Sequence, residues 1–467
     1  MVGYLTGCDD LLDTEPVEEV EPEVALEDLE GVDAVVTSIY NRLQSEFRYG
    51  QQLILAPEIL ADNSYLHPDP SGRFSGEAVN ATGAHINFWN TGYTLINESN
   101  TVVQSLNEMI DEEGDDDGFD LARAEMLIGE ALFNRAYAYH DFARTYGYEP
   151  NHPMYDESGE QEGLSVPLRT EPTEDAEAAD ERPRATTQEI YDQIEQDLLD
   201  AIEFLEGNDR GDPYYVSYEA AHALLARVYL YAEQWDEAAT HAENAINAAG
   251  AEFVDPEEYA GDFQGHPSDE ALFELSIDPD TESPGVNEAI APIILPYQWH
   301  DLMAADNLME LYDEDDVRLD LYDEEGGHTF TVKYSQSRGP HTDNTPLIRY
   351  PELYLIRAEA LVEEGDVSGG VDYLNAVQEA RGGYETSTSS YDEAIDEIMD
   401  ERRREFAFEG HRFFDLKRRG GEGEGRYAEI PKAEGESPVP YDDFRVIAPI
   451  PETEEENNPE IQQNPEY

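Results

Sequence analysis

Residues 221–235 read AHALLARVYLYAEQW, and their apolar side chains recur every three or four positions. This spacing places them along one face of an α-helix. After a short turn, a second helical stretch follows with Ala238, Ala242 and Ala245 on its inward face. The stretch therefore predicts two neighbouring helices joined by a short turn.

The same plan recurs at residues 358–377, which read AEALVEEGDVSGGVDYLNAV. Here the turn falls at Gly365 and Asp366, and Gly370 takes a small-residue position at the helix crossing. Helix pairs of this kind are typical of tetratricopeptide repeats. Because the two copies are not contiguous, we expect a mainly α fold. It is a tetratricopeptide-like helical-repeat scaffold with long loop insertions and little β structure.

Periodicity and composition divide the chain into a tether at residues 1–30 and a single helical body at residues 31–467. The body should open with a helix whose stripe runs from Val36 to Phe47, and capping boxes at Thr186 and Ser390 should begin two later helices. A short β-pair is expected near residues 329–334. Repeat-like helix pairs are expected near 123–146, 187–248 and 350–380, and loop-rich insertions near 62–88, 150–185 and 253–345.

The charge composition is strongly acidic. The 467 residues include 108 Asp and Glu against 27 Lys and Arg, a formal net charge of −81. Nucleic acid is excluded as a partner because phosphate backbones are bound by basic patches. Direct electrostatic docking on anionic lipid headgroups is also disfavoured. Aromatic residues make up 10% of the chain, which predicts a folded core and not an acidic disordered chain.

Lysine is almost absent: only Lys333, Lys417 and Lys432 occur. A surface covered by carboxylates repels itself at low ionic strength. At about 1 M salt the Debye length falls to about 3 Å and this repulsion largely disappears. We therefore predict adaptation to high salt; the alternative is an acidic solubility surface in a protein that works at ordinary salt.

Cys8 is the single cysteine, so the chain has no intrachain disulfide and no site of several cysteines. It follows Leu5, Thr6 and Gly7, a pattern typical of the cleavage box of a bacterial lipoprotein. A complete signal would place an apolar stretch of about 7–15 residues upstream, so the signal here is expected to be truncated. The alternative is an exposed Cys in a tail. Since no run of 18 apolar residues occurs, membrane attachment is expected through the N-terminal lipid only.

Several motifs spread along the chain carry a family resemblance. CDDLLD stands at residues 8–13, WNTGY at 89–93, and QNPEY closes the chain at 463–467. The long stretch ERRREFAFEGHRFFDLKR occupies residues 401–418. Together these motifs resemble the SusD/RagB family of glycan-binding outer-membrane lipoproteins. One departure is Glu466, since Gly is usual before the last Tyr. Further matching stretches are NRAYAY at 134–139, ALLARVYL at 223–230 and RYPELYL at 349–355.

The resemblance implies a function and a location. A protein of this kind would capture an oligosaccharide or another small nutrient without chemical conversion. It would hand this ligand to a SusC-like TonB-dependent outer-membrane channel. The resemblance also implies a lipid anchor at Cys8, a place on the extracellular face of the outer membrane, and a Bacteroidetes-type source that the acidic composition suggests is halophilic.

Sugar recognition needs aromatic rings for the apolar faces of pyranoses and planar polar groups for their hydroxyls, on loops held by a rigid frame. Two stretches offer this mixture, and SusD-like proteins bind glycan with loops in these parts of the chain. We expect Trp299 or Tyr297 in the platform, with Arg73 or Asn80 reaching hydroxyls. The candidate glycan-binding residues are Tyr65, His67, Asp69, Arg73, Phe74, Asn80 and His85, together with Tyr297, Trp299 and His300.

The charged residues at 401–418 could form a catalytic or anion-binding cluster, but at helical spacing they can also pair with one another and with loop carbonyls. The second hypothesis is favoured. For Arg135 we expect a paired, partly buried side chain. For Trp89 we expect a place in the core, and the alternative is a platform for a sugar ring. The residues concerned are Arg402, Arg403, Arg404, Glu405, His411, Arg412 and Asp415.

Enzymatic motifs are missing: the sequence has no nucleophile elbow, Walker A loop or HExxH. No cofactor is expected. Asp313–Asp316 could hold a hard cation such as calcium, although a solvated acidic segment is the preferred interpretation. Two alternative functions stay open, a secreted glycan-degrading hydrolase and a soluble helical-repeat adaptor for protein partners.

Overall fold

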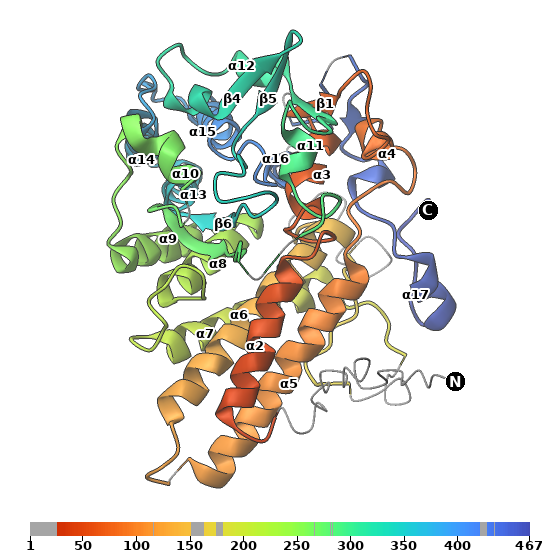
Figure 1. Ribbon diagram of the computed structural model, residues 1–467, viewed down its shortest axis with the longest axis vertical. Helices are drawn as coiled ribbons and strands as arrows, with labels where there is room; N and C mark the ends of the chain where they lie inside the picture. The colour runs from red at the N-terminus through yellow and green to blue at the C-terminus, as the bar shows by residue number, and fades with distance from the viewer. Residues whose placement is uncertain are drawn as a thin grey trace, which may run out of the picture.

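The computed structural model describes residues 26–114, 116–150, 163–173, 181–265, 267–280, 282, 284–420, 427–433 and 435–467. Cys8 and almost all of the expected tether lie outside these ranges. Long helices form one end of the molecule, and the strands and short helices of the insertions gather at the other end (Figure 1).

The first layer of the body consists of four helices that follow one another in space. α2 (Leu29–Leu43), α5 (Trp89–Glu113), α6 (Leu121–Tyr146) and α7 (Thr187–Leu205) pack side by side in this order. The expected capping box is confirmed at Thr186, whose side chain accepts from the Glu189 amide while Glu189 bonds back. These contacts give the scaffold a rigid start.

The repeat pattern is confirmed by two helix pairs. α8 (Tyr218–Tyr231) packs on α9 (Trp235–Ala249), and α13 (Tyr350–Glu363) packs on α14 (Val367–Ala380). α13 also packs directly on α9. The segment between these two helices, residues 250–349, therefore leaves the repeat stack after α9 and rejoins it at α13. A Cβ on Gly370 would lie 2.5 Å from the Ala358 carbonyl oxygen, so only glycine permits this close crossing.

Some boundaries differ from the sequence predictions. The helix near residues 123–146 is a single element, and its partner is α7. α2 begins at Leu29, before the expected boundary of the body, and ends at Leu43. Phe47 therefore leaves the helical stripe and is 48% exposed. Trp235 does not close the first repeat helix but opens α9, because the chain turns at residues 232–234.

The expected interior roles of two residues are confirmed. Trp89 is buried and packs against Tyr93 and Tyr146. Arg135 donates to both carboxylate oxygens of Asp197 and to Asn100. Neither residue presents a free face to solvent, so both stabilise the helical layer.

In the part that the structure describes, the strands form four antiparallel pairs, and one isolated bridge joins Leu164 to Thr186. The pair expected near 329–334 is the hairpin of β4 (Tyr322–Glu325) and β5 (His328–Thr331). β2 (Ala271–Leu275) pairs with β6 (Thr345–Arg349), and β7 (Glu429–Ile430) with β8 (Val439–Pro440). The pair with functional consequences joins β1 (Ser64–Leu66) to β3 (Leu302–Ala304). It brings two of the predicted insertions together.

The remaining elements are one long helix, α15, and a set of shorter helices. α15 (Tyr391–Glu405) begins at the expected cap, Ser390, and carries the charged motif into the core. The shorter helices are α3 (Gln52–Leu60), α4 (Ser75–Ala78), α10 (Tyr259–Phe263), α11 (Ala291–Ile294), α12 (Asp306–Met309), α16 (Arg412–Arg419), α17 (Glu452–Asn457), η1 (Pro256–Glu258), η2 (Val317–Leu321) and η4 (Phe444–Val446).

None of the three lysines extends along the surface. Lys333 donates to Glu409 at 2.6 Å, and Lys417 donates to Glu149 and to two backbone carbonyls. Lys432 is half-buried and donates to the carbonyl oxygen of Ile59. Each lysine that the sequence retains thus has an internal partner.

Candidate functional site

The β1–β3 pair aligns the two loops that sequence analysis singled out. Tyr65 lies opposite Met303, and the His67 amide donates to the Asp301 carbonyl at 2.9 Å. The segment at residues 297–301 therefore runs beside the 62–88 loop. In Figure 1 the elements of this region, β1, α4, α11 and β5, lie close together at one end of the molecule.

Three histidines meet next to this pair. The ring of His67 lies 4.4 Å from that of His300 and 5.5 Å from that of His328, measured between centroids, and all three are half-buried. Phe330 lies behind them, 6.3 Å from His67. The structure thus brings two of the predicted residues, His67 and His300, into direct contact and adds His328, which the sequence did not indicate.

Arg73 and Trp299 form the centre of the candidate site. The Arg73 guanidinium lies 3.8 Å from the centroid of the Trp299 ring, a cation–π contact. It donates to Ser71 at 2.8 Å and to Asn287 at 2.6 Å, and lies 3.7 Å from the Asp301 carboxylate. Because four groups hold it, the guanidinium is fixed in direction while it remains partly exposed.

Asp301 is the buried anchor of this arrangement. Its carboxylate accepts from the Ser71 amide at 2.5 Å and from the Ser71 hydroxyl at 2.7 Å. It also balances the charge of Arg73. Sequence analysis missed Asp301 and Ser71, because neither residue type stands out among 108 acidic residues and ordinary loop serines.

The accessible groups of the site are few. Tyr297 is 63% exposed, and Asp69 is also exposed. Tyr65 and Trp299 are half-buried and pack against the core with part of their rings. A ligand can therefore reach Tyr297, Asp69 and the exposed part of Arg73.

Three predicted site residues lie in the interior. Phe74, Asn80 and His85 are only 6%, 3% and 7% exposed. Burial, together with the charge of Lys417, lowers the pKa of His85 to about 3, so its ring is neutral and packs against Phe413. The loop folds back onto the body here, which a composition rich in polar residues does not reveal.

Two hollows continue the site beyond Arg73. One has a volume of about 330 Å³ and is lined by Arg73, Phe74 and residues of the loop between α2 and α3. The other, of about 480 Å³, lies on the far side of Phe47. Both volumes are within the range usual for small-ligand sites. The residues that line the first hollow are Glu46, Phe47, Gln51, Gln52, Arg73, Phe74, Glu77 and Asn287.

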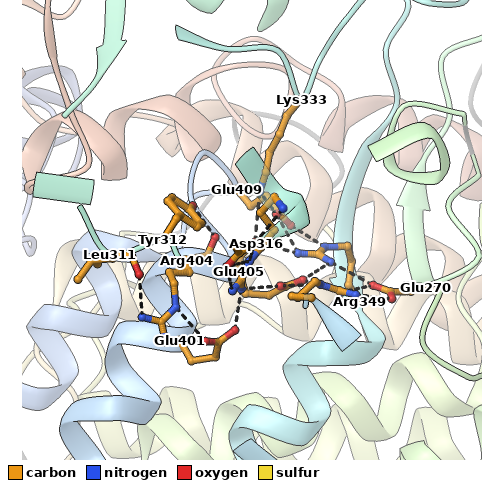
Figure 2. Close-up of polar contacts among 12 residues, drawn as sticks. Glu270, Leu311, Tyr312, Asp316, Lys333, Arg349, Glu401, Arg404, Glu405 and Glu409 are labelled. Carbon is orange, nitrogen blue, oxygen red and sulfur yellow. Dashed lines mark hydrogen bonds and ion pairs between the residues drawn. The ribbon is translucent and has the colours of Figure 1, made fainter. Parts of the chain in front are cut away.

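A cluster of buried charges resembles a catalytic centre but has a different role (Figure 2). Glu405 accepts from Arg349 at 2.8 Å, from Arg381 at 2.9 Å and from Arg318 at 3.1 Å. Burial opposes ionisation, but the charges of Arg381 and Arg349 outweigh it and hold the pKa of Glu405 well below its usual range. All four side chains are buried, so substrate has no access to them.

The other charged residues at 401–418 also pair internally. Arg402 donates to Asp415 at 2.9 Å, and Arg412 to Asp62 at 2.7 Å. Arg403 donates to Asn63 at 2.8 Å. The hypothesis of a structural role is confirmed for these side chains, which tie α15 and α16 to the loop after α3.

Among the described residues, no group of three or more His, Cys, Asp or Glu is arranged to hold a metal ion. In the acidic segment at residues 313–316, Asp316 is buried and paired with Arg318 at 2.7 Å, while the other three residues are exposed. Over the same described ranges, no helix is both long and apolar enough to span a membrane.

A stack of helix pairs that supports an open surface of aromatic and planar polar side chains defines a ligand-binding protein of the helical-repeat class. Comparison with known proteins is more specific. The SusD family model matches residues 324–467, and the model for starch-binding proteins associating with the outer membrane matches residues 10–230. The chain belongs to the SusD/RagB family.

Relatives cover nearly the whole chain. SusD-like protein P38 of Formosa agariphila is 22% identical in an alignment of 482 positions that covers 89% of each chain. A SusD superfamily protein of Bacteroides thetaiotaomicron superposes with a TM-score of 0.79 at 26% identity, over 94% of this chain and 99% of that one. A SusD-like carbohydrate binding protein of Bacteroides vulgatus shares the fold, with a TM-score of 0.76 at 20% identity over 93% and 97% of the two chains.

Proposed function

We propose that this protein captures oligosaccharides at the cell surface and delivers them to a SusC-type TonB-dependent channel of the outer membrane. The observation that carries the proposal is the contact of Arg73 with Trp299, which joins the two segments that the β1–β3 pair aligns; the exposed ring of Tyr297 stands two residues before Trp299. Two loops far apart in the sequence thereby place aromatic and planar polar groups on one open surface. Family membership supports a carbohydrate as the ligand.

In this proposal each residue has a distinct role. Tyr297 offers its exposed ring to the apolar face of a pyranose, and Trp299 holds Arg73 in position by stacking. Arg73 donates to sugar hydroxyls, while Asp69 accepts from them. Because the area buried is small and hydroxyl desolvation offsets part of the gain, we expect dissociation constants in the micromolar to millimolar range.

Binding and retention would be the whole of the chain's own chemistry. The buried charge cluster is closed to substrate. A lipid on Cys8 would hold the protein at the extracellular face, where the channel supplies the energy-coupled step. We further propose that it acts at molar salt, as its charge composition indicates.

The test is glycan binding by calorimetry in about 2 M salt, with variants Tyr297→Ala and Trp299→Ala. Tyr297→Ala should weaken binding at least several-fold without changing the melting temperature, because its ring is exposed. Trp299→Ala should weaken binding because Arg73 loses the ring that holds it in position. It should also lower stability somewhat, because part of the Trp299 ring packs against the core. Leu199→Ala, at an exposed position on α7, is the matched control.

Three results would decide against the proposal. Unchanged affinity of Tyr297→Ala and Trp299→Ala would place the glycan site elsewhere. Release of reducing ends from a bound glycan would favour the alternative of a hydrolase. Absence of binding to any glycan, combined with capture of a protein partner, would favour the alternative of an adaptor.

A further inference from the structure

The hollows that flank Phe47 differ from the rest of the candidate site in their charge. The smaller one joins Arg73 and is lined by two carboxylates, Glu46 and Glu77. The larger one adds Glu282, Glu288 and Asp343. Phe47 lines both hollows and is 48% exposed. Its ring can therefore pack against a sugar unit of a ligand that spans the two hollows.

The positive charges available to a ligand here are few. Arg73 is the single Lys or Arg among the residues that line the two hollows, and it already lies 3.7 Å from Asp301. Lys432 approaches Glu77, but its ammonium group faces the backbone carbonyl of that residue at 3.3 Å. Neither Glu46 nor Glu77 forms an ion pair within the described ranges, so both carboxylates remain uncompensated.

The remaining groups suit hydroxyls. Gln52 is half-exposed, and Asn287 presents an amide whose oxygen is taken by Arg73. Each amide and each carboxylate can hydrogen-bond a neutral hydroxyl. A uronate or sulfate group would instead meet Glu46 or Glu77 at short range. Such partly buried charges are screened by salt much less than charges on the open surface.

From this geometry we infer that the proposed glycan site accepts sugars without anionic groups and excludes uronates and sulfated sugars. The inference rests on the proposed function and adds the class of substrate. It depends on local carboxylates and not on the net charge of −81, because the long-range field is largely screened in molar salt. The exclusion should therefore persist at salt concentrations where general repulsion has disappeared.

The first experiment is a binding panel in about 2 M salt. It would contain neutral glycans (starch, laminarin, galactomannan and arabinoxylan) and anionic ones (alginate, oligogalacturonate and carrageenan). Binding confined to neutral members supports the inference. An anionic member bound as tightly as the best neutral one overturns it and leaves the proposed function intact. Failure to bind any member overturns the proposed function itself.

The second experiment isolates the charge. A carboxymethyl derivative of the bound neutral glycan is compared with its hydroxyethyl derivative, which adds similar bulk without charge. We expect the charged derivative to bind at least about tenfold more weakly. The double variant Glu46→Gln/Glu77→Gln should narrow this gap at least about threefold, because it removes the two charges and keeps side chains that can hydrogen-bond hydroxyls. Equal affinity of the two derivatives for wild-type protein would refute the inference.

A matched control separates local from general electrostatics. Glu112→Gln/Glu113→Gln removes the same charge at the C-terminal end of α5, where both side chains are exposed. It should leave the gap between the two derivatives unchanged. An equal effect of both double variants would show that net charge sets the preference, and the assignment to Glu46 and Glu77 would then be wrong.

Discussion

Replacing Glu405 by Gln tests the buried charge cluster that fixes α15 to the body. Glu405 accepts from the guanidinium groups of Arg349, Arg381 and Arg318 at 2.8–3.1 Å. Gln has nearly the same volume, so the change removes charge without opening a cavity. The three buried guanidinium groups then share one carboxylate fewer. A buried positive charge that loses a negative partner lowers the stability of the fold, because the interior has a low dielectric constant.

The expected loss in the free energy of unfolding depends on the carboxylate partners that each arginine retains. Removing one partner of a buried ion pair costs about 3–5 kcal/mol. Arg349 retains Glu409 at 2.8 Å, and Arg381 retains Glu270 at 2.6 Å. We therefore expect a loss of about 3 kcal/mol, at the lower end of this range. With an unfolding entropy of about 2.1 cal/mol/K per residue, a chain of this length should melt about 3 °C lower.

Urea unfolding followed by circular dichroism measures the change at constant salt, because guanidinium chloride would alter the ionic strength. The effect should be the same at about 0.5 and 3 M salt, since a buried cluster is little screened. Glu112→Gln on the exposed end of α5 is the control and should change stability by less than about 0.5 kcal/mol. A Glu405→Gln variant as stable as the control would refute the argument.

The pH dependence gives a second check on the same variant. The pKa of Glu405 is held well below its usual range, so its contribution is complete above the unfolded pKa of about 4.3. It is lost as pH falls below that value, because the unfolded chain takes up the proton first. The difference between wild type and variant should therefore shrink below about pH 4.3; a constant difference down to pH 2.5 would contradict the assigned pKa shift.

Three further predictions follow from charge, anchoring and pH. The melting temperature should fall steadily when salt is lowered from molar to millimolar, because 108 acidic residues face 27 basic ones; a flat curve would contradict adaptation to high salt. Cys8→Ala, expressed with a complete signal peptide, should shift the protein from the membrane to the soluble fraction, and persistent membrane association would indicate another anchor. His222 and His241 touch through their Nδ1 atoms at 2.8 Å, and burial, then the charge of His241, lowers the pKa of His222 to about 4. Their neutral pair should stabilise the fold above about pH 6.5 and lose this effect as pH falls toward 4. His222→Gln/His241→Gln should make the urea midpoint of unfolding depend less on pH between about 6.5 and 4. An unchanged dependence on pH would argue against the neutral pair.

The candidate site could be predicted only in part. Arg73, Trp299, Tyr297, His67 and His300 were all indicated by residue type and loop composition. The structure brings Arg73 into contact with Trp299 and His67 into contact with His300, and leaves Tyr297 exposed. Whether these residues bind glycan stays a prediction. Phe74, Asn80 and His85 have the same residue types and stand in the same loop, yet they are buried. Composition cannot distinguish the two groups, because a long loop folds back according to contacts made far away in the sequence.

The hollows beside Phe47 were beyond sequence analysis for a related reason. Phe47 continues the apolar spacing of α2, which predicts a buried place on the helix. The helix ends at Leu43, and Gln44 then donates to the Ser276 carbonyl, 232 residues away. This distant bond holds the loop and leaves Phe47 at the surface. The end of a helix depends on such tertiary partners more than on local periodicity.

The sequence by itself determined the helical pairs, their small crossing residues, the acidic composition and the family, because helical periodicity and motif spacing are local properties of the chain. Only the tertiary structure decided that β1 pairs with β3, that Asp301 fixes Arg73 against Trp299, and which loop residues are buried. These features depend on contacts between segments more than 200 residues apart. The free energy of such contacts comes from burial and charge pairing in three dimensions, which no local pattern of residues encodes.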